Sequence, residues 1–525
     1  MVNLPVEFTN RMKEYLGEEY DAFMASYEAP EVKGLRLNTL APRESLGAIC
    51  NELEDLGENI NKIPWMDMAY SYVSIDNAET AEGETLSKAE RLKKVLCTRP
   101  GKHPYHEAGA YYIQEPSAMA PVVYLDVRPG DRVLDLCAAP GGKSTEIAAC
   151  LKGEGILISN EIMSDRARIL SENIERMGVR NALVISEDPR NISDKFAGFF
   201  DKVLVDAPCS GEGMFRRSQT AIDEWSPDNV KLCADRQEWI LDEAAKMLAP
   251  NGTLVYSTCT FSKEEDEMQV ISFLDRHEDF YLDEMKPYEG MSKGFSSEVS
   301  DESRPYGGVG VRLFPHKLKG EGHYICKLRK KGLEEEANDA DIMKIPPVTG
   351  YEPDLSKNER TNIKEMFDFL ECNIACSDFM KYFEDRRLTR FKDQIYLLPK
   401  ECPSLKGLKV LRPGLHLGTI LKNRFEPSHA LAMALNMSEV KNAYILSCDS
   451  REIYKYFNGE TFNIEEEYIR VNKIERDNDS KKGKSKDKNA SGWYVIFVDG
   501  FSAGWGKLTN CIMKNHYPKG LRKNL

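Results

Sequence analysis

One stretch of the chain restricts its possible folds more than any other: an apolar run followed at once by a glycine turn and a helical segment. The apolar run is residues 133–136, the turn is Pro140-Gly-Gly142, and residues 143–151 have a helical pattern. This order predicts a buried strand that ends at the N-terminus of a helix. Backbone N–H groups at such a place can bind the polar groups of a ligand.

The turn excludes two common classes of phosphate ligand. A nucleoside triphosphate loop of the form GxxxxGK needs glycine at position 137, where Cys137 stands. The dinucleotide pattern GxGxxG is also missing from this turn. We therefore expect a nucleoside-type ligand that is neither a triphosphate nor a dinucleotide.

Apolar runs alternate with helical patterns through residues 126–330. The pattern predicts strands at 133–136, 155–159, 182–186, 202–206 and 253–258, with helices such as 165–177 and 230–248 between them. Such alternation predicts an α/β domain with an open, mostly parallel sheet covered by helices on both faces. Ligands of these sheets bind beyond the carboxyl ends of the strands.

Acids and thiols follow the predicted strands at that edge. Glu161 comes about twenty residues after the glycine turn, where an acid can accept hydrogen bonds from ribose hydroxyls. Asp188 follows the third strand, Asp206 and Cys209 follow the fourth, and Cys259 follows the fifth. A single acid at a strand end would carry little information, but their recurrence indicates a ligand site.

The two cysteines suggest the chemistry. Buried thiols would be the ordinary interpretation, but Cys209 lies in a predicted turn and Ser257-Thr258 precede Cys259. A thiolate there could act as a nucleophile if donors or a cation such as Lys143 lower its pKa. Addition of a thiolate to carbon 6 of a pyrimidine makes carbon 5 nucleophilic toward a methyl donor, and Asp206 could hydrogen-bond nitrogen 3.

These motifs carry a family resemblance. Asp135-Leu-Cys-Ala-Ala-Pro-Gly-Gly-Lys143, Asp206-Ala-Pro-Cys-Ser-Gly211 and Ser257-Thr-Cys-Thr260 together resemble the RNA cytosine-5 methyltransferases of the NOL1/NOP2/Sun family. Shorter matches flank them over roughly residues 30–330: Gly34-Leu-Arg-Leu-Asn-Thr39, Tyr112-Ile-Gln-Glu-Pro-Ser117, Arg312-Leu-Phe-Pro-His316 and Gly320-Glu-Gly-His323.

The resemblance implies a Rossmann-like core that binds S-adenosylmethionine. The cofactor-binding residues that it implies are Cys137, Ala138, Ala139, Pro140, Gly141, Gly142, Lys143, Glu161, Arg166, Asp188 and Asp206. It further implies that Cys259 is the nucleophile and that Cys209 helps to release the methylated RNA. In DNA cytosine-5 methyltransferases the nucleophile follows the fourth strand, which would be Cys209, and the chemistry alone does not choose between them. Pro189 departs from the glycine that the family commonly has after Asp188.

The flanking regions predict further domains. Residues 1–125 fit a small α+β RNA-binding domain, 126–330 the methyltransferase domain, and 331–390 a linker and helical connector. Residues 391–525 carry a net charge of +8, against −22 for the remainder, and the lysine-rich run 481–488 accounts for only part of this excess. Short β-runs with interleaved aromatic and basic residues suggest a small RNA-binding barrel. This region resembles the PUA-like domain of bacterial ribosomal RNA methyltransferases of the RsmF type.

The sequence thus predicts methylation of carbon 5 of a cytosine in small-subunit ribosomal RNA. Two alternatives stay open: a transfer-RNA methyltransferase with the same chemistry, and a ribosome-assembly factor whose methyl transfer is secondary. The chain has no apolar run of about 18 residues and a charged N-terminus, so we expect a cytoplasmic protein without a membrane span. The spacing of the thirteen cysteines predicts reduced thiols and no metal site, and a monomer is expected.

Overall fold

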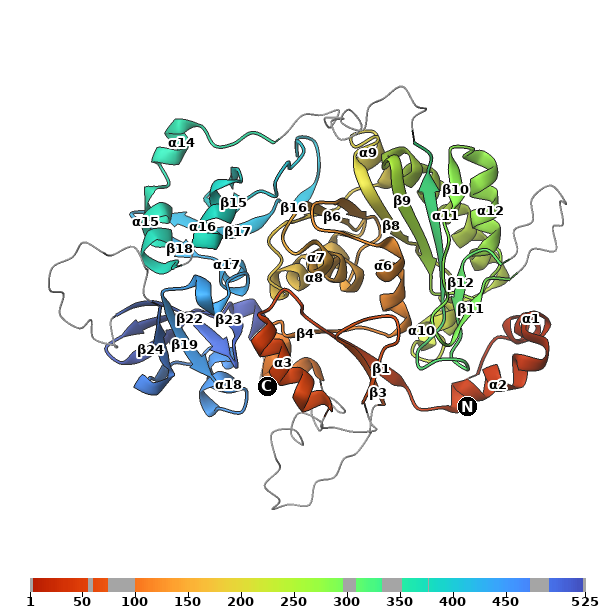
Figure 1. The fold of residues 1–525 in the computed structure, drawn as a ribbon, viewed down its shortest axis with the longest axis horizontal. Helices are drawn as coiled ribbons and strands as arrows, with labels where there is room; N and C mark the ends of the chain where they lie inside the picture. The colour runs from red at the N-terminus through yellow and green to blue at the C-terminus, as the bar shows by residue number, and fades with distance from the viewer. Residues whose placement is uncertain are drawn as a thin grey trace, which may run out of the picture.

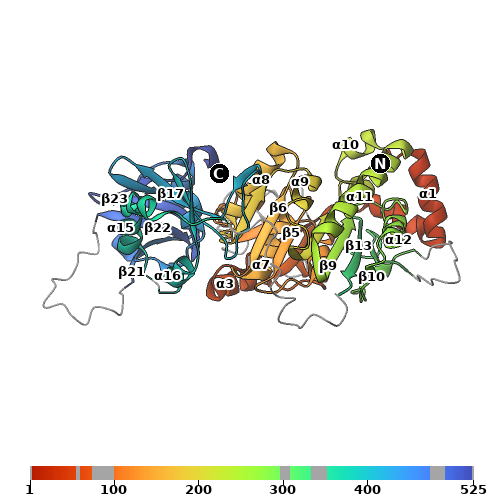
Figure 2. The ribbon, with the colours of Figure 1, turned by 90° about the horizontal axis from the view of Figure 1, so that it is seen from above.

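The structure is a computed structural model that describes residues 3–54, 60–73, 100–295, 308–332, 352–375, 377–472 and 491–522. Figure 2 shows an elongated molecule, with the central sheet in the middle, α1 (Val6–Leu16) at one end and the C-terminal sheets at the other. The predicted linker lies mostly outside the described residues, and the lysine-rich run 481–488 lies wholly outside them.

A central parallel sheet forms the core and confirms the predicted α/β fold. Its parallel strands run in the order β9-β8-β5-β6-β7, with β5 central. Their bounds are β5 Arg132–Asp135, β6 Ile156–Asn160, β7 Ala182–Ile185, β8 Phe200–Asp206 and β9 Leu248–Thr258. The strand order reverses direction between β5 and β8, which is where open α/β sheets bind their ligands.

Helices cover both faces of this sheet (Figure 1). They include α6 Ala120–Leu125, α7 Gly142–Leu151, α8 Ser164–Arg176, α9 Pro189–Ser193, α10 Gln219–Glu224, α11 Pro227–Met247 and α12 Glu267–Arg276. The apolar residues of the strands face two separate clusters, one that includes Leu134 and Ile158 and one that includes Val133 and Leu157. Alternate residues of each strand therefore pack on opposite sides, as expected for strands buried on both faces.

Antiparallel strands extend the sheet at both edges. On one side β13 (His323–Lys330) pairs with β9, followed by β12 (Val311–Leu313) and β11 (Met291–Lys293), while β10 (Phe280–Leu282) also pairs with β13. On the other side β16 (Val410–Arg412) pairs with β7. Pairing at these edges covers backbone groups that would otherwise stay open to a second chain.

The N-terminal residues form two separate parts. Helices α1 and α2 (Tyr20–Ala25) pack on the methyltransferase region through an aromatic cluster that includes Phe8, Phe23 and Phe261. The chain then forms a sheet in the order β2-β3-β1-β4, with helix α3 beside it. The bounds are β1 Val32–Leu37, α3 Arg43–Glu54, β2 Ile60–Lys62, β3 Ala69–Val73, α5 Pro104–Glu107 and β4 Tyr111–Ile113.

The C-terminal third contains two sheets where the sequence suggested a single barrel. One sheet has the order β14-β15-β17-β18 and the other the order β20-β24-β23-β22-β19-β21. The strands are β14 Leu388–Phe391, β15 Gln394–Leu397, β17 Leu415–Leu421, β18 Arg424–Pro427, β19 Asn442–Leu446, β20 Phe462–Asn463, β21 Ile469–Val471, β22 Gly492–Val498, β23 Phe501–Thr509 and β24 Ile512–Asn515. The helices are α14 Lys357–Thr361, α15 Lys364–Asn373, α16 Ser377–Glu384, α17 His429–Met433 and α18 Arg451–Asn458.

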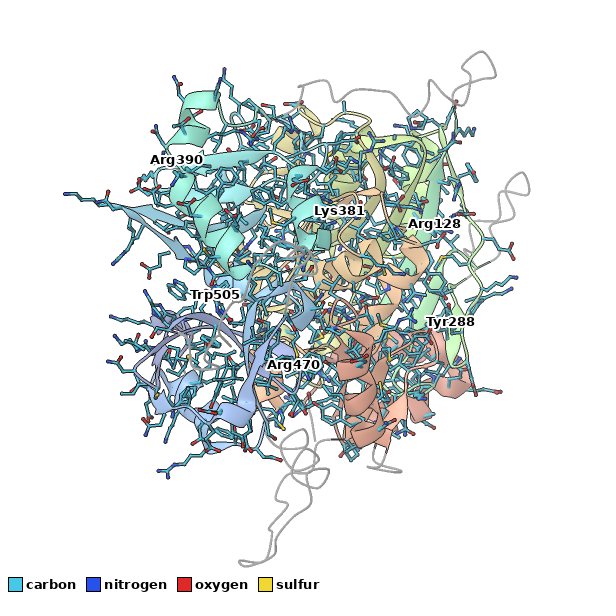
Figure 3. All side chains as sticks on the ribbon, turned by 60° about the vertical axis from the view of Figure 1, so that its left-hand side comes forward. Arg128, Tyr288, Lys381, Arg390, Arg470 and Trp505 are labelled. Carbon is cyan, nitrogen blue, oxygen red and sulfur yellow. The ribbon has the colours of Figure 1, made fainter. Side chains whose placement is uncertain are left out.

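The two C-terminal sheets share one apolar core, in which Leu397 and Leu417 of the first pack with Val495 and Trp505 of the second. Figure 3 places Arg390 and Trp505 on one side of the molecule and Arg128 and Tyr288 on the opposite side. Strand β16 lies within residues 391–525 but pairs with β7, so this region is joined to the central sheet. The domain boundary at residue 391 stays a prediction.

Two features are absent from the described residues. Within the ranges given above, no helix is long and apolar enough to cross a membrane. The same part of the chain holds no group of three or more His, Cys, Asp or Glu side chains that could bind a metal ion.

Candidate active site

The glycine turn after β5 presents the N-terminus of α7 at the ligand-binding edge of the sheet. Gly141 caps this helix with φ +113°, a conformation that favours glycine, and a Cβ there would lie 3.1 Å from Leu170. A Cβ on Gly142 would lie 3.2 Å from the Gln114 side chain. Because the first turn of a helix leaves N–H groups without intrahelical partners, this turn can bind an anionic or polar group.

Glu161 and Arg166 border this turn. The Glu161 carboxylate is buried, accepts a hydrogen bond from the Met163 N–H at 3.0 Å, and lies 3.3 Å from the Arg166 guanidinium. Arg166 also donates to the carbonyl of Ala139 at 3.0 Å. Arg166 therefore connects the predicted ribose-binding acid to the predicted cofactor turn.

Asp188 lies at the start of α9, directly before Pro189. Its Oδ1 accepts a hydrogen bond from the Arg190 N–H at 3.0 Å, which makes it the N-cap of the helix. Pro189 is the first residue of that helix, a position that tolerates proline because the missing N–H would have no partner. One oxygen of Asp188 is therefore committed to helix capping.

Asp206 lies at the end of β8, in a network of donors. Its Oδ2 accepts from the Lys143 ammonium at 2.8 Å and its Oδ1 from the Ser257 hydroxyl at 2.8 Å. The Nε2 atom of His323 lies 3.7 Å from Oδ1. Burial alone would raise the pKa of Asp206, but Lys143 and His323 hold this pKa well below its usual range. Asp206 is therefore a carboxylate at neutral pH.

The structure brings Cys209 and Cys259 together. Strands β8 and β9 are parallel neighbours, with Asp206 opposite Ser257, and the two Sγ atoms beyond them lie 3.3 Å apart. The hydrogen bond with Cys259 and burial raise the pKa of the Cys209 thiol well above its ordinary value. Lys143 pairs with Asp206, so Cys209 does not meet the condition that a cation lowers its pKa.

Two further residues near this site carry no role in the predictions from sequence. Asp135 is fully buried, accepts from the Ser144 hydroxyl at 2.6 Å, and keeps Oδ1 without a hydrogen-bond partner among the described residues. Burial raises the pKa of Asp135 to about 7. His323 is also buried, with Nε2 unpartnered in the described part of the chain. Both residues belong to quoted motifs, but nothing in those motifs signals how close they come to Asp206.

The predicted site residues fall into two groups. Lys143, Asp206, Cys209 and Cys259 form one cluster, and the turn residues with Glu161 and Arg166 adjoin it through Lys143. Cys137 instead packs against the apolar core. Burial raises the pKa of its thiol far above the ordinary value, so this side chain is an apolar contact rather than a thiolate.

A second candidate surface lies on the C-terminal sheet. Lys507 is exposed on β23, opposite Trp493 on β22 and Lys514 on β24. The Lys507 ammonium lies 5.2 Å from the centre of the Trp493 ring, and the His516 ring lies 4.5 Å from it. We call these four residues the Trp493 surface. An aromatic ring among cations suits stacking and phosphate contacts with single-stranded nucleic acid.

Comparison with known families divides the chain into four matches. Residues 122–329 match "16S rRNA methyltransferase RsmB/F" and residues 4–116 match the N-terminal domain of the 16S rRNA methyltransferase RsmF. Residues 373–435 match the first C-terminal domain of the RsmF rRNA methyltransferase, and residues 443–523 match the RsmF PUA domain. The last two matches correspond to the two C-terminal sheets.

Individual relatives agree with these matches. The chain is 30% identical over 437 residues to the ribosomal RNA small subunit methyltransferase F of Vibrio parahaemolyticus, covering 82% of this chain and 83% of the relative. It is 28% identical over 527 residues to the protein of the same name from Vibrio campbellii, covering 99% and 98%. The crystal structure of PH0851 matches with a TM-score of 0.52 and 26% identity, over 62% of this chain and 66% of that one.

Proposed function

Because this chain belongs to the RsmF family of 16S rRNA methyltransferases, which depend on S-adenosylmethionine, we propose that it methylates carbon 5 of a cytosine in small-subunit ribosomal RNA through a covalent cysteine–cytosine adduct. The observation that carries this proposal is the pair of thiols 3.3 Å apart beside the Asp206 carboxylate. A cytosine methyltransferase of this kind needs one group to attack carbon 6 and a second to remove a proton from the adjacent carbon 5.

The residues around the glycine turn fit S-adenosylmethionine in their charges. The N–H groups of α7 suit the carboxylate of the cofactor, and Glu161 suits its ribose hydroxyls. The buried Oδ1 of Asp135, which has no hydrogen-bond partner among the described residues, suits a positively charged group of the cofactor. Ile162 and Met163 are exposed apolar side chains next to Glu161 and suit a purine ring. The bound cofactor supplies the methyl group.

Cys259 forms the bond to carbon 6 in this proposal. Nitrogen 3 takes up a proton from solvent as that bond forms, and the Asp206 carboxylate accepts a hydrogen bond from the new N–H group. The Cys209 and Cys259 sulfurs lie 3.3 Å apart, so both can reach the same base. Once the Cys259 sulfur is bonded to carbon, its negative charge is gone, and Cys209 becomes easier to ionise. After methyl transfer to carbon 5, Cys209 gives up its own proton to solvent, and the resulting thiolate accepts the carbon 5 proton. The electrons of that C–H bond restore the double bond between carbons 5 and 6 and expel Cys259 as a thiolate.

The RNA must present its cytosine outside a base-paired stack for the thiol to reach it. We propose that the Trp493 surface contributes to RNA binding through stacking and phosphate contacts. A monomer and a cytoplasmic location remain part of this proposal.

The test is transfer of labelled methyl groups from S-adenosylmethionine to isolated small ribosomal subunits. We expect Cys259→Ala to be inactive, Cys209→Ala to accumulate a covalent protein–RNA adduct, and Cys372→Ala, which changes an exposed cysteine on α15, to behave as wild type. An adduct that accumulates in Cys259→Ala instead would make Cys209 the nucleophile.

The same assay separates the alternative substrates and roles. Transfer by the wild type to transfer RNA, but not to subunits or ribosomal RNA, would keep the chemistry and reject the substrate. Subunit assembly that requires the protein yet proceeds normally with Cys259→Ala would instead support an assembly role separable from methyl transfer.

A further inference from the structure

A fully buried carboxylate lies behind the two cysteine turns and contacts both. The Glu265 side chain is 0% exposed and lies in the turn before α12. Its Oε2 accepts hydrogen bonds from the Ser210 backbone N–H and from the Gln237 amide, both at 2.9 Å. Its Oε1 contacts the Ser210 hydroxyl at 2.5 Å.

The Ser210 hydroxyl extends this contact to the second turn. It lies 2.9 Å from the Thr260 hydroxyl. Ser210 directly follows Cys209 and Thr260 directly follows Cys259, so the chain from Glu265 through Ser210 to Thr260 joins the residue after each cysteine. The N–H of Gly213 adds a direct bond between the turns by donating to the carbonyl of Cys259 at 2.8 Å.

Other buried carboxylates of this region have different partners. Glu212 accepts from the Trp225 indole N–H and the Phe261 N–H, which fixes the far side of the same turns. Glu267 pairs with Arg312. Glu265 has no cation among the ion pairs of the described residues, so its burial is balanced by hydrogen bonds alone, all of them to the cysteine turns and to α11.

From this geometry we propose that Glu265 is a positioning residue that sets the separation of the Cys209 and Cys259 thiols. The inference rests on the proposed function, in which one thiol attacks carbon 6 and the other removes the proton from carbon 5. These carbons are bonded to each other in one ring, so the two sulfurs must keep a fixed separation to reach both. An error of about 1 Å in the position of a reacting group can cost roughly 100-fold in rate.

The test compares Glu265→Ala with the conservative Glu265→Gln. Alanine removes every acceptor and leaves the Ser210 N–H, the Ser210 hydroxyl and the Gln237 amide without this partner. Glutamine keeps an oxygen for the Ser210 and Gln237 N–H groups and places an NH₂ group toward the Ser210 hydroxyl. We expect Glu265→Ala to lower kcat by about 10- to 100-fold while KM for S-adenosylmethionine and RNA changes less than about threefold. Glu265→Gln should recover most of the lost kcat.

A second readout separates positioning from general destabilisation. Glu265 bonds both the N–H and the hydroxyl of Ser210, and the Ser210 hydroxyl links it to Thr260, so its loss should misplace Cys209 more than Cys259. Release by Cys209 should then slow more than attack by Cys259, and the fraction of Glu265→Ala protein trapped as covalent RNA adduct during turnover should exceed that of the wild type. The matched control is Glu243→Ala, which removes a buried carboxylate on α11 that binds Ser193 and Lys246 away from the thiols. It should change neither kcat nor the adduct fraction.

The outcomes are distinguishable. If Glu265→Ala fails to fold, Ser210→Ala, which removes only the bridging hydroxyl, should show the same changes to a smaller degree. Wild-type kcat and adduct fraction in folded Glu265→Ala, or in Ser210→Ala, would overturn the inference. Equal losses in Glu265→Ala and Glu265→Gln would also overturn it, since hydrogen-bond geometry would then not be the cause. Full methyl transfer by Cys259→Ala would instead refute the proposed function itself.

Discussion

Replacing Arg312 by methionine should destabilise the methyltransferase region more than any exposed charge change. Arg312 is 0% exposed and donates from Nε to Glu267 at 2.7 Å and from Nη1 to the Phe261 carbonyl at 3.2 Å. Its Nη2 lies 3.0 Å from Asp266. Methionine would leave two buried carboxylates without their cation.

The expected loss follows from the burial of the Arg312, Asp266 and Glu267 side chains. Removing one partner of a buried ion pair costs about 3–5 kcal/mol, because the remaining charge stays buried and uncompensated. For a domain of about 200 residues, this loss lowers Tm by roughly 6–20 °C. Differential scanning calorimetry of the whole chain measures the shift of the transition that includes the central sheet.

The loss should depend on pH with a defined sign. Burial already raises the pKa of Asp266 well above its usual value, although Arg312 lowers it. Without Arg312 this pKa rises further, so the folded variant binds more protons than the unfolded chain. The free energy of unfolding of the variant then falls as pH rises above the pKa that Asp266 has in the unfolded chain. We therefore expect Arg312→Met to lose more free energy of unfolding, relative to the wild type, at pH 8 than at pH 5.5.

The matched control is Arg128→Met, which breaks an exposed pair with Asp126 on the side of the molecule opposite the C-terminal sheets (Figure 3). Such a pair contributes at most about 1 kcal/mol. A loss below about 1 kcal/mol for Arg312→Met, or a deficit that grows toward acidic pH, would refute the reasoning.

Two further predictions concern the RNA and the target base. Changing both Lys507 and Lys514 to glutamine should weaken RNA binding and reduce the slope of log K against log salt by up to about 2, measured by filter binding. Lys381→Gln, an exposed lysine on α16, should leave that slope unchanged if the Trp493 surface is the relevant one. His323→Phe should lower kcat about tenfold or more with unchanged S-adenosylmethionine affinity, because Asp206 loses a neighbour whose Nε2 lies 3.7 Å away. Wild-type kcat in this variant would remove His323 from the site.

Local pattern was sufficient to predict the elements of the central sheet. The strand predicted at 182–186 is β7 at Ala182–Ile185, and the helix predicted at 165–177 is α8 at Ser164–Arg176. Buried parallel strands are continuous apolar runs, and an amphipathic helix shows its own period, so both are visible in a short window. The strand predicted at 253–258 is longer in the structure, since β9 begins at Leu248 and pairs with Phe200 there.

Local patterns do not show which strands far apart in the sequence pair with each other. Nothing around residues 410–412 distinguishes a strand of the central sheet from one of the C-terminal region, because what decides it is the open edge of β7. The division of the C-terminal third into two sheets is of the same kind. A short β-run has the same local sequence character whichever neighbour it pairs with.

The sequence by itself determined that Asp206, Cys209 and Cys259 follow two strands of one parallel sheet, and hence that they share an edge. Only the tertiary structure decided that the thiols lie 3.3 Å apart, that Lys143 neutralises Asp206 rather than a thiol, and that Glu265 joins both turns. The physical reason is that strand ends are fixed by local periodicity. Hydrogen bonds between side chains some 50 residues apart depend instead on how the helices and turns pack around them.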